Sequence, residues 1–248
     1  MREIFDEVLE TIENDDIREF AIKIIDAAPQ YFFEVPASSS LKYHPDYACT
    51  TPLGLAKHTV ALVRILNHMF GVESVANQFT SRERDLLRVS GIAHDMMKSG
   101  TQEDYERNKY TKFDHPLRAA KFVESIQDNN ISDKDKEFCM HCIESHMGIW
   151  NTDKRNPGVV LPTPQDKYQI ILHLADYLAS RKDIEIKFDH LPEVEIEVPD
   201  INEWKFTFGK HAGKTIPEVA EIDRQYIIWA KANMEREPAK SLLKEFEI

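Results

Sequence analysis

The sequence contains few cysteines, no long apolar run and no excess of positive charge. The three cysteines, Cys49, Cys139 and Cys142, are too few for a disulfide framework, which favours a reducing compartment. No apolar stretch approaches the length that spans a bilayer. The charged beginning of the chain also lacks the apolar core of a signal peptide. We therefore expect a cytoplasmic protein that has no membrane partner.

The formal net charge is −12. Such a charge disfavours non-specific binding of nucleic acid over the whole surface, because phosphates would be repelled. A local basic groove or a bound metal ion could still attract a phosphate. The first 202 residues carry the whole acidic excess, since residues 203–248 hold eight Lys/Arg and eight Asp/Glu. This asymmetry indicates a domain boundary near residue 200.

Helical periodicity dominates the chain, which is 42% hydrophobic and 30% charged and contains neither internal repeats nor low-complexity tracts. We predict a mainly α fold in three parts. Residues 1–182 form a helical domain, residues 183–202 an acidic linker or edge strand, and residues 203–248 a small α(+β) module. In the last part, residues 206–214 have the pattern of a strand followed by a glycine turn.

Capping residues predict where most helices begin. Asn14 separates two amphipathic helices over residues 2–13 and 15–28. Residues 99–112 are polar and are expected to form a loop. Further helices are expected to begin at Thr51-Pro52, Thr80, Asp114, Ser132, Thr163-Pro164 and Thr215.

Histidines and aspartates occupy unusual places on these helices. Leu55, Leu62 and Ile65 share a helix face with His58, so His58 faces the core. Asp176 ends an apolar helix, where a carboxylate is costly unless it is paired or binds a cation. Imidazoles and carboxylates mixed in this ratio suit Mn, Fe, Ni, Co or Zn rather than calcium.

One or two divalent ions are therefore expected. A first ion would be bound by His58, His94, Asp95 and Asp176, and a second by His115 and His146 with Asp95 as the bridge. Such ions make a bound water acidic enough to attack phosphorus near neutral pH, and they screen the phosphoryl charge.

The order His58, His94-Asp95, Asp176 resembles the HD superfamily of metal-dependent phosphohydrolases. The flanking segments 53–59, 94–98 and 175–179 extend the resemblance, which covers roughly residues 30–182. It implies an all-helical fold whose core helices present the ligands to one cleft. Two-metal members place extra histidines where His115 and His146 fall.

The resemblance further implies that Asp95 and Lys98 are catalytic, with Lys98 holding a phosphate. Residues 36–44 are similar to the approach to the first metal helix in nuclease-like HD proteins, so His44 is either a loop residue or a contact of the active site. The Gly-Tyr-Pro extension of cyclic-di-GMP phosphodiesterases is missing after His146. That activity is disfavoured.

The tail resembles a small C-terminal module found behind some DNA exonucleases. The pattern is Phe-Gly-Lys-x-x-Gly-Lys, then Val219-Ala220, Tyr226 and Trp229. It implies an accessory role in nucleic-acid binding. Lys210 and Lys214 would contact phosphates, and Trp204 or Tyr226 would stack on bases. The same turn could equally be a solvated hairpin.

Three other features have plainer interpretations. His141 faces away from His146 and is predicted to be structural. His173, three residues before Asp176, could support that carboxylate as a neighbour of the metal site. Cys139-x-x-Cys142 has no partner pair at zinc-site spacing, so buried thiols are favoured.

Together these patterns predict a metal-dependent phosphohydrolase that cleaves a nucleotide or a nucleic-acid phosphodiester, as a phosphodiesterase, nuclease or nucleotidase. Two alternatives belong to other classes. One is a mixed-valent di-iron HD oxygenase, since a few HD proteins use these ligands for oxygen chemistry. The other is a non-catalytic protein that binds nucleic acid or a partner. The metal, the exact substrate and the oligomeric state stay open.

Overall fold

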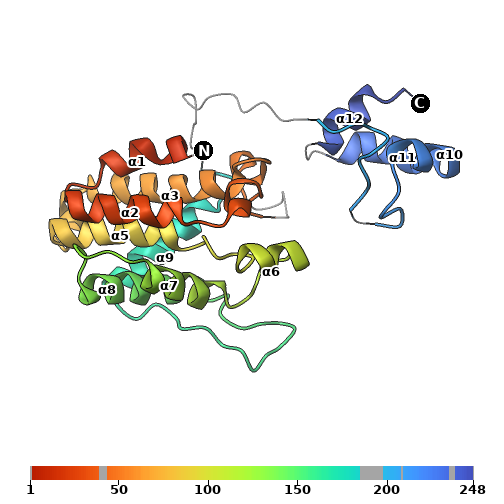
Figure 1. Cartoon of the computed structure of the whole chain (residues 1–248). Helices are drawn as coiled ribbons and strands as arrows, with labels where there is room; N and C mark the ends of the chain where they lie inside the picture. Colours follow the sequence, from red (N-terminus) through yellow and green to blue (C-terminus); the bar gives the residue numbers. More distant parts are fainter. Residues whose placement is uncertain (1, 39–43, 185–197, 208, 235–237, 248) are drawn as a thin grey trace. The chain divides into compact units, whose positions relative to one another are not determined.

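The computed structural model describes residues 2–38, 44–184, 198–207, 209–234 and 238–247 (Figure 1). Within these residues the chain forms twelve α-helices and no sheet, and its β pairing consists of two isolated bridges. The predicted mainly α fold is confirmed. Residues 1–49 and 53–189 make up one compact unit, and residues 190–248 belong to a second. No helix in the described residues is long and apolar enough to cross a membrane.

Nine of the helices in the described residues belong to the first unit. They are α1 (Asp6–Glu10), α2 (Asp15–Asp26), α3 (Gly54–Phe70), α4 (Glu73–Ala76), α5 (Ser81–Ala93), α6 (Gln102–Arg107), α7 (His115–Ser125), α8 (Asp133–Glu144) and α9 (Lys167–Ala179). Short 3₁₀ helices cover Arg2–Phe5, Gln30–Phe33 and Asp46–Cys49.

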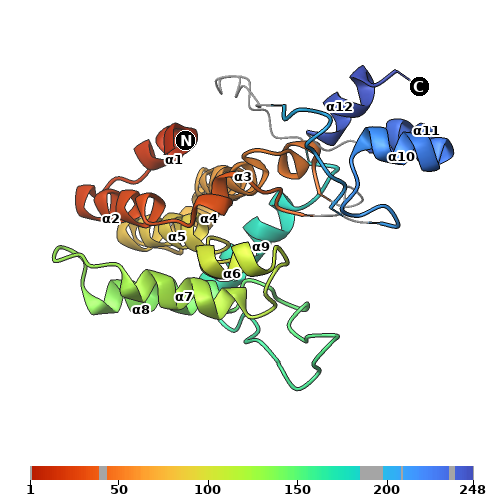
Figure 2. The same ribbon diagram turned by 45° about the vertical axis from the view of Figure 1, so that its right-hand side comes forward.

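Helix α5 lies at the centre of this unit. It packs against α2, α3, α8 and α9, and Figures 1 and 2 both show it between α2 and α8. Gly91 permits its close approach to α3, because a Cβ at this position would lie 2.6 Å from Leu62 Cδ2. Leu62 therefore occupies the space at Gly91. This contact holds the helices that carry His58 and His94 together.

Local capping explains several of the helix starts that the sequence predicted correctly. Thr80, Ser132 and Thr215 each form a capping box with the residue three positions later. The Asn14 side chain accepts from the Ile17 N–H at 3.0 Å and begins α2. A cap needs only residues within one turn, so a short sequence motif is sufficient to predict it.

The expected helix start at Thr51-Pro52 is wrong. Helix α3 begins at Gly54, after Leu53 in the left-handed region (φ 73°), and it has no side-chain cap. The Leu53 and Leu55 N–H groups instead donate to the carbonyls of Phe33 and Val35, both at 2.9 Å. A distant backbone segment thus satisfies N–H groups that a helix start leaves without partners.

Two further expectations in this unit are wrong. Helix α9 begins at Lys167 rather than at Thr163-Pro164, because the Asp166 side chain accepts from the N–H groups of Tyr168 and Gln169. Residues 99–112 are not all loop, since α6 begins there with a capping box between Thr101 and Asp104.

The second unit contains α10 (Ile216–Ile222), α11 (Arg224–Asn233) and α12 (Ala239–Glu245). Its core is separate from that of the first unit and includes Phe206, Val219 and Leu242. The predicted strand is reduced to one bridge between Lys205 and Thr215, although residue 208 lies outside the described residues. Most of the predicted acidic segment, residues 185–197, also lies outside them.

Candidate metal centre

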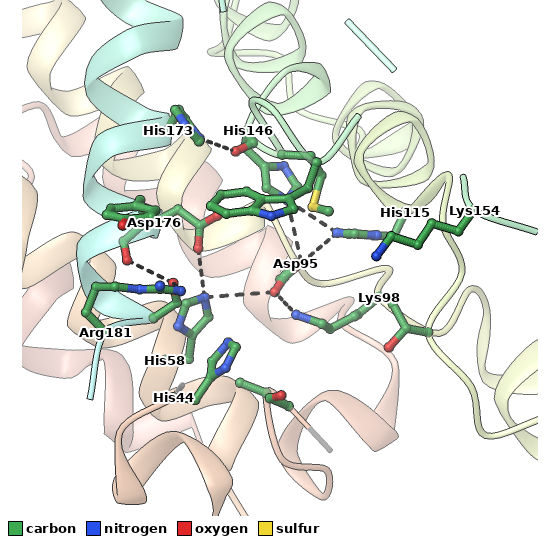
Figure 3. A pocket seen from close by; sticks show the side chains of 17 residues that line it. His44, His58, Asp95, Lys98, His115, His146, Lys154, His173, Asp176 and Arg181 are labelled. Atoms are coloured by element: carbon green, nitrogen blue, oxygen red, sulfur yellow. Dashed lines mark hydrogen bonds and ion pairs between the residues drawn. The ribbon is translucent and has the colours of Figure 1, made fainter. Parts of the chain in front are cut away.

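Five segments of the first unit bring the six predicted ligands together in one centre. Five of these ligands, all but His94, line a pocket (Figure 3). His58 lies on α3, His94 and Asp95 follow α5, His115 begins α7, His146 follows α8, and Asp176 lies in the last turn of α9. The four histidines and Asp95 are at most 3% exposed. Ionisable groups gathered in this way are costly unless they compensate one another or bind an ion.

The first set surrounds one oxygen from each carboxylate. His58 Nε2 lies 3.0 Å from Asp176 Oδ1 and 3.9 Å from Asp95 Oδ2. His94 Nε2 lies 3.5 Å from Asp95 Oδ2 and 3.6 Å from Asp176 Oδ1. Ligands bound at about 2.1 Å to one ion stand roughly 3.0–3.5 Å apart, so these atoms have suitable spacing.

The second set surrounds the other oxygen of Asp95. His115 Nε2 lies 3.1 Å and His146 Nε2 3.7 Å from Asp95 Oδ1, and the two nitrogens are 3.3 Å apart. Asp95 therefore turns one oxygen toward each set. The sets adjoin, because donor atoms of His94, His146 and Asp176 also lie within 4.8 Å of one another.

Three of the histidines are held in the same way. Their Nδ1 atoms donate to backbone carbonyls three residues earlier: His94 to Gly91 at 2.7 Å, His115 to Lys112 at 2.8 Å and His146 to Ile143 at 2.8 Å. A neutral ring with its proton on Nδ1 has a lone pair on Nε2. The backbone thus directs three Nε2 lone pairs into the centre, as metal-binding histidines require.

These lone pairs fit a cation. The buried His94 Nε2 has no hydrogen-bond partner in the described residues and faces two carboxylate oxygens. The His115 and His146 lone pairs face each other. Lone pairs aimed at one another or at carboxylates repel, whereas a divalent ion between them attracts all of them. The residues are positioned to bind a divalent metal.

Burial and neighbouring charges shift the pKa values of His94, His146 and Asp95 toward the protonation states that metal binding needs. Burial lowers the pKa of His146 to about 3, and His94 and His115 act in the same direction. Burial also lowers the pKa of His94, although Asp95 opposes this. Burial alone would raise the pKa of Asp95, but Lys98 and His94 hold it well below its usual range. The imidazoles of His94 and His146 are then neutral and the Asp95 carboxylate is ionised near pH 7, as metal ligands must be.

Acid should destabilise the metal-free protein through His146. Its pKa is about 3 in the folded state and 6.5 without burial, so between these values the unfolded chain binds more protons. The free energy of unfolding therefore falls as the pH falls, by about 3 kcal/mol for this residue from pH 7 to pH 4. Urea unfolding with a chelator present would measure the slope. The slope should flatten in His146→Gln and persist in His68→Gln, an exposed position of α3; an equal slope in both would contradict the assignment.

Lys98 lies in the pocket with its ammonium paired to Asp95 Oδ2. The turn that carries it is held by Tyr31, whose hydroxyl donates to the Gly100 carbonyl at 2.7 Å and accepts from the Ser99 N–H at 3.1 Å. Tyr31 was not among the residues predicted from the sequence. Its two hydrogen bonds join residues that are 68 and 69 positions apart in the sequence. No local sequence motif predicts contacts over such a separation.

The centre opens into a cavity of about 650 Å³. His44 lines this cavity, with its ring 6.2 Å from that of His58, and burial lowers its pKa to about 4. Four further lining residues were not predicted as site residues from the sequence: Trp150, Lys154, Tyr177 and Arg181. Only the position of Tyr177, directly after Asp176, could have indicated one of them.

Comparison with known families finds a match for the segment that carries most of these ligands. Residues 65–181 match the HD domain family, and this span carries five of the six ligands, from His94 to Asp176. This part of the chain is similar to the HD domain. HD domains are generally metal-dependent hydrolases, and the His/Asp centre described above agrees with that chemistry. His58 precedes the matched span but faces the same centre.

A second family match covers the tail. Residues 206–235 match the family described as Exodeoxyribonuclease X-like C-terminal, which confirms the second resemblance seen in the sequence. Comparison with curated proteins and with solved structures finds no significant match. The similarity to known proteins therefore rests on the two family matches.

His141, His173, Cys139 and Cys142 do not belong to the ligand groups of the HD centre. His173, which could have supported Asp176, donates from Nδ1 to the His146 carbonyl at 2.7 Å instead. His141 pairs with Asp166 at 2.7 Å on the surface of the unit. Cys139 and Cys142 are fully buried thiols, and burial raises the pKa of Cys139 to about 12.

Gly148 is expected to be essential for the position of His146. Its φ is +56°, and a Cβ there would lie 2.2 Å from the His173 ring. Gly148→Ala should push His173 away from the His146 carbonyl and weaken metal affinity about 10–100-fold, as loss of such a supporting contact typically does. Calorimetric titration with Mn²⁺ would measure this. Gly158→Ala, in the same loop with an exposed and unhindered position, is the control; equal affinities would contradict the role of Gly148.

The predicted nucleic-acid contacts lie in the second unit. Lys210 Nζ is 2.6 Å from Asp223 Oδ2 and lies over the Tyr226 ring, so its charge is partly compensated. Lys214 is exposed. Trp204 and Tyr226 both pack edge-on against Phe206. Among the described residues of this unit, the most exposed aromatic side chain is Trp229, at 49% exposed.

Proposed function

We propose that the HD domain hydrolyses a phosphoester of a nucleotide or a nucleic acid. The proposal depends on the orientation of Asp95. Its two carboxylate oxygens face two different sets of imidazoles, beside an open cavity that Lys98 also lines. A carboxylate shared between two ligand sets is typical of centres that act on phosphoryl groups with metal ions.

Each residue has a physical role in this proposal. The histidines and carboxylates would hold one or two divalent ions, which would supply a nucleophile from water near neutral pH and screen the phosphoryl charge. Lys98, three residues after Asp95, places an ammonium where a non-bridging phosphate oxygen would lie. The Nδ1 bonds to backbone carbonyls keep the imidazoles oriented without reorganisation during the reaction.

Two observations support a nucleotide or nucleic-acid substrate. The tail matches the Exodeoxyribonuclease X-like C-terminal family. In addition, Lys154 and Arg181 line the cavity beside Lys98, and this gives a local positive region in a chain whose net charge is −12. A phosphate is therefore attracted to the cavity rather than to the surface as a whole.

The test is a panel of nucleoside phosphates and single- and double-stranded oligonucleotides, each with Mn²⁺, Ni²⁺, Co²⁺ or Mg²⁺. The wild type should cleave part of the panel in a metal-dependent way. Anaerobic purification, metal analysis and EPR belong to the same experiment. A mixed-valent iron signal without any phosphoester cleavage would replace the hydrolase by the di-iron oxygenase. No activity together with unchanged binding of nucleic acid in His94→Ala/Asp95→Ala would favour the non-catalytic alternative.

A further inference from the structure

An aromatic pair lies at the mouth of the metal centre. Trp150, in the loop after α8, and Tyr177, on α9, both line the cavity. Their ring planes are 12° apart and their centroids 5.8 Å apart, so the two rings are nearly parallel. Trp150 is 47% exposed and Tyr177 is 36% exposed. A large apolar surface left open beside a polar centre is unusual enough to require an explanation.

The pair is held in place by its surroundings. The Arg181 guanidinium carbon lies 4.5 Å from the centre of the Tyr177 ring, and the His173 ring lies 6.4 Å from that of Trp150. His173 in turn bonds to the His146 carbonyl. The contacts that orient a metal ligand therefore also orient the aromatic pair. A rigid aromatic surface binds a planar ring with little loss of side-chain freedom.

Two cations flank the same cavity. Figure 3 shows Arg181 toward the His58 side of the pocket and Lys154 toward the His115 side. Neither has a carboxylate partner among the residues that the structure describes, whereas Lys98 is paired with Asp95. Lys154 and Arg181 thus offer positive charge that no carboxylate of the described residues compensates. A phosphate-bearing ligand supplies the missing negative charge.

The cavity is large enough for such a ligand. Its volume of about 650 Å³ falls inside the range of about 300–1,000 Å³ found for pockets that bind small molecules. The aromatic surface, the unpaired cations and the metal ligands all face this one space. A ligand that satisfies all three has a planar ring joined to a phosphate.

We propose that Trp150 and Tyr177 are the platform on which a nucleobase of the substrate stacks, with its phosphate at Lys98 and the metal ligands. This inference rests on the proposed function and specifies its substrate: a nucleotide with an unpaired base, free or at a single-stranded position. In a duplex both faces of each base are covered by its neighbours, so a paired base has no face to offer.

The kinetic test compares a single-stranded oligothymidylate with a fully abasic oligomer of the same length. Trp150→Ala should raise KM for the oligothymidylate about 5- to 100-fold, the usual effect of losing one stacking contact, and leave KM for the abasic oligomer unchanged. Trp150→Phe should restore most of the affinity. Ile149→Ala, at the adjacent residue, which is 80% exposed, is the matched control and should behave like the wild type.

A binding test gives a readout that does not depend on activity. The chain has three tryptophans, so Trp204→Phe/Trp229→Phe leaves Trp150 as the one fluorescent indole. Thymidine 5′-monophosphate should quench this fluorescence, and 2-deoxyribose 5-phosphate, which lacks the base, should not. The titration can be run with Mn²⁺ and with a chelator.

The outcomes separate this inference from the proposed function. Phosphoester cleavage with equal KM effects of Trp150→Ala on both oligomers, or equal quenching by both monophosphates, would overturn the platform and leave the hydrolase intact. Base-dependent quenching without cleavage of any phosphoester would support the platform and refute the hydrolase. Faster cleavage of a duplex than of the single strand would also overturn the platform.

Discussion

Replacing Asp95 with alanine is expected to lower hydrolysis by at least about 1,000-fold, because both ligand sets lose a charged oxygen and a metal ion supplies several kcal/mol of charge stabilisation. Asp95 Oδ2 faces His94 and Oδ1 faces His115, at 3.5 and 3.1 Å. No other carboxylate in the described residues lies between these two imidazoles. Metal content by elemental analysis should fall together with the rate.

The effect must be separated from loss of folding. Asp133→Asn, at an exposed position in the first turn of α8, should keep full activity and full metal content. Circular dichroism of Asp95→Ala should retain the helical signal of the wild type. A folded Asp95→Ala protein that still cleaves at the wild-type rate would show that the activity arises elsewhere, or from a contaminant.

Replacing Asp85 with alanine is expected to destabilise the first unit by about 3–5 kcal/mol, the usual effect of removing one partner of a buried ion pair. Asp85 is 1% exposed on α5. Its carboxylate accepts from the N–H groups of Glu13 and Asn14, at 3.2 and 2.9 Å, and from Arg88 at 2.8 Å. Arg88 also donates to Asn67 at 2.7 Å. The substitution would leave the buried guanidinium without its carboxylate.

Urea unfolding at pH 7 would measure this change. Asp26→Ala is the control, because Asp26 pairs with Arg2 at 3.1 Å where both side chains are about half exposed. An exposed pair of this kind contributes at most about 1 kcal/mol. Equal losses in the two variants would mean that the Asp85 network adds no more than a surface pair does.

Asp85 also shows where sequence-based prediction stops. Nothing in the local pattern of α5 separates it from an exposed helical aspartate, because its partners Glu13 and Asn14 lie more than 70 positions away. The caps at Thr80 and Ser132 were predictable, because each is completed within four residues. Thr51-Pro52 contains good capping residues, yet the helix begins later in the chain. There the carbonyls of residues 33 and 35 accept hydrogen bonds from the N–H groups of Leu53 and Leu55.

The metal ligands lie between these two cases. Residue type and helical position were sufficient to predict His58, His94, Asp95, His115, His146 and Asp176 as one group, and the structure brings their donor atoms close together. Their metal-binding role stays a prediction. The sequence did not reveal that one Asp95 oxygen faces each set, nor that backbone carbonyls orient three of the rings.

By itself the sequence determined the helical class, most capping sites and the residues of the HD centre. Each of these depends on chemistry within a few turns of one helix or on a fixed order of ligand types. The tertiary structure alone decided the start of α3, the closeness of α3 and α5 at Gly91, the buried Asp85–Arg88 pair and the aromatic pair beside the cavity. These features depend on which distant backbone and side-chain atoms meet, and the free energy of burying a polar or aromatic group is set by those neighbours.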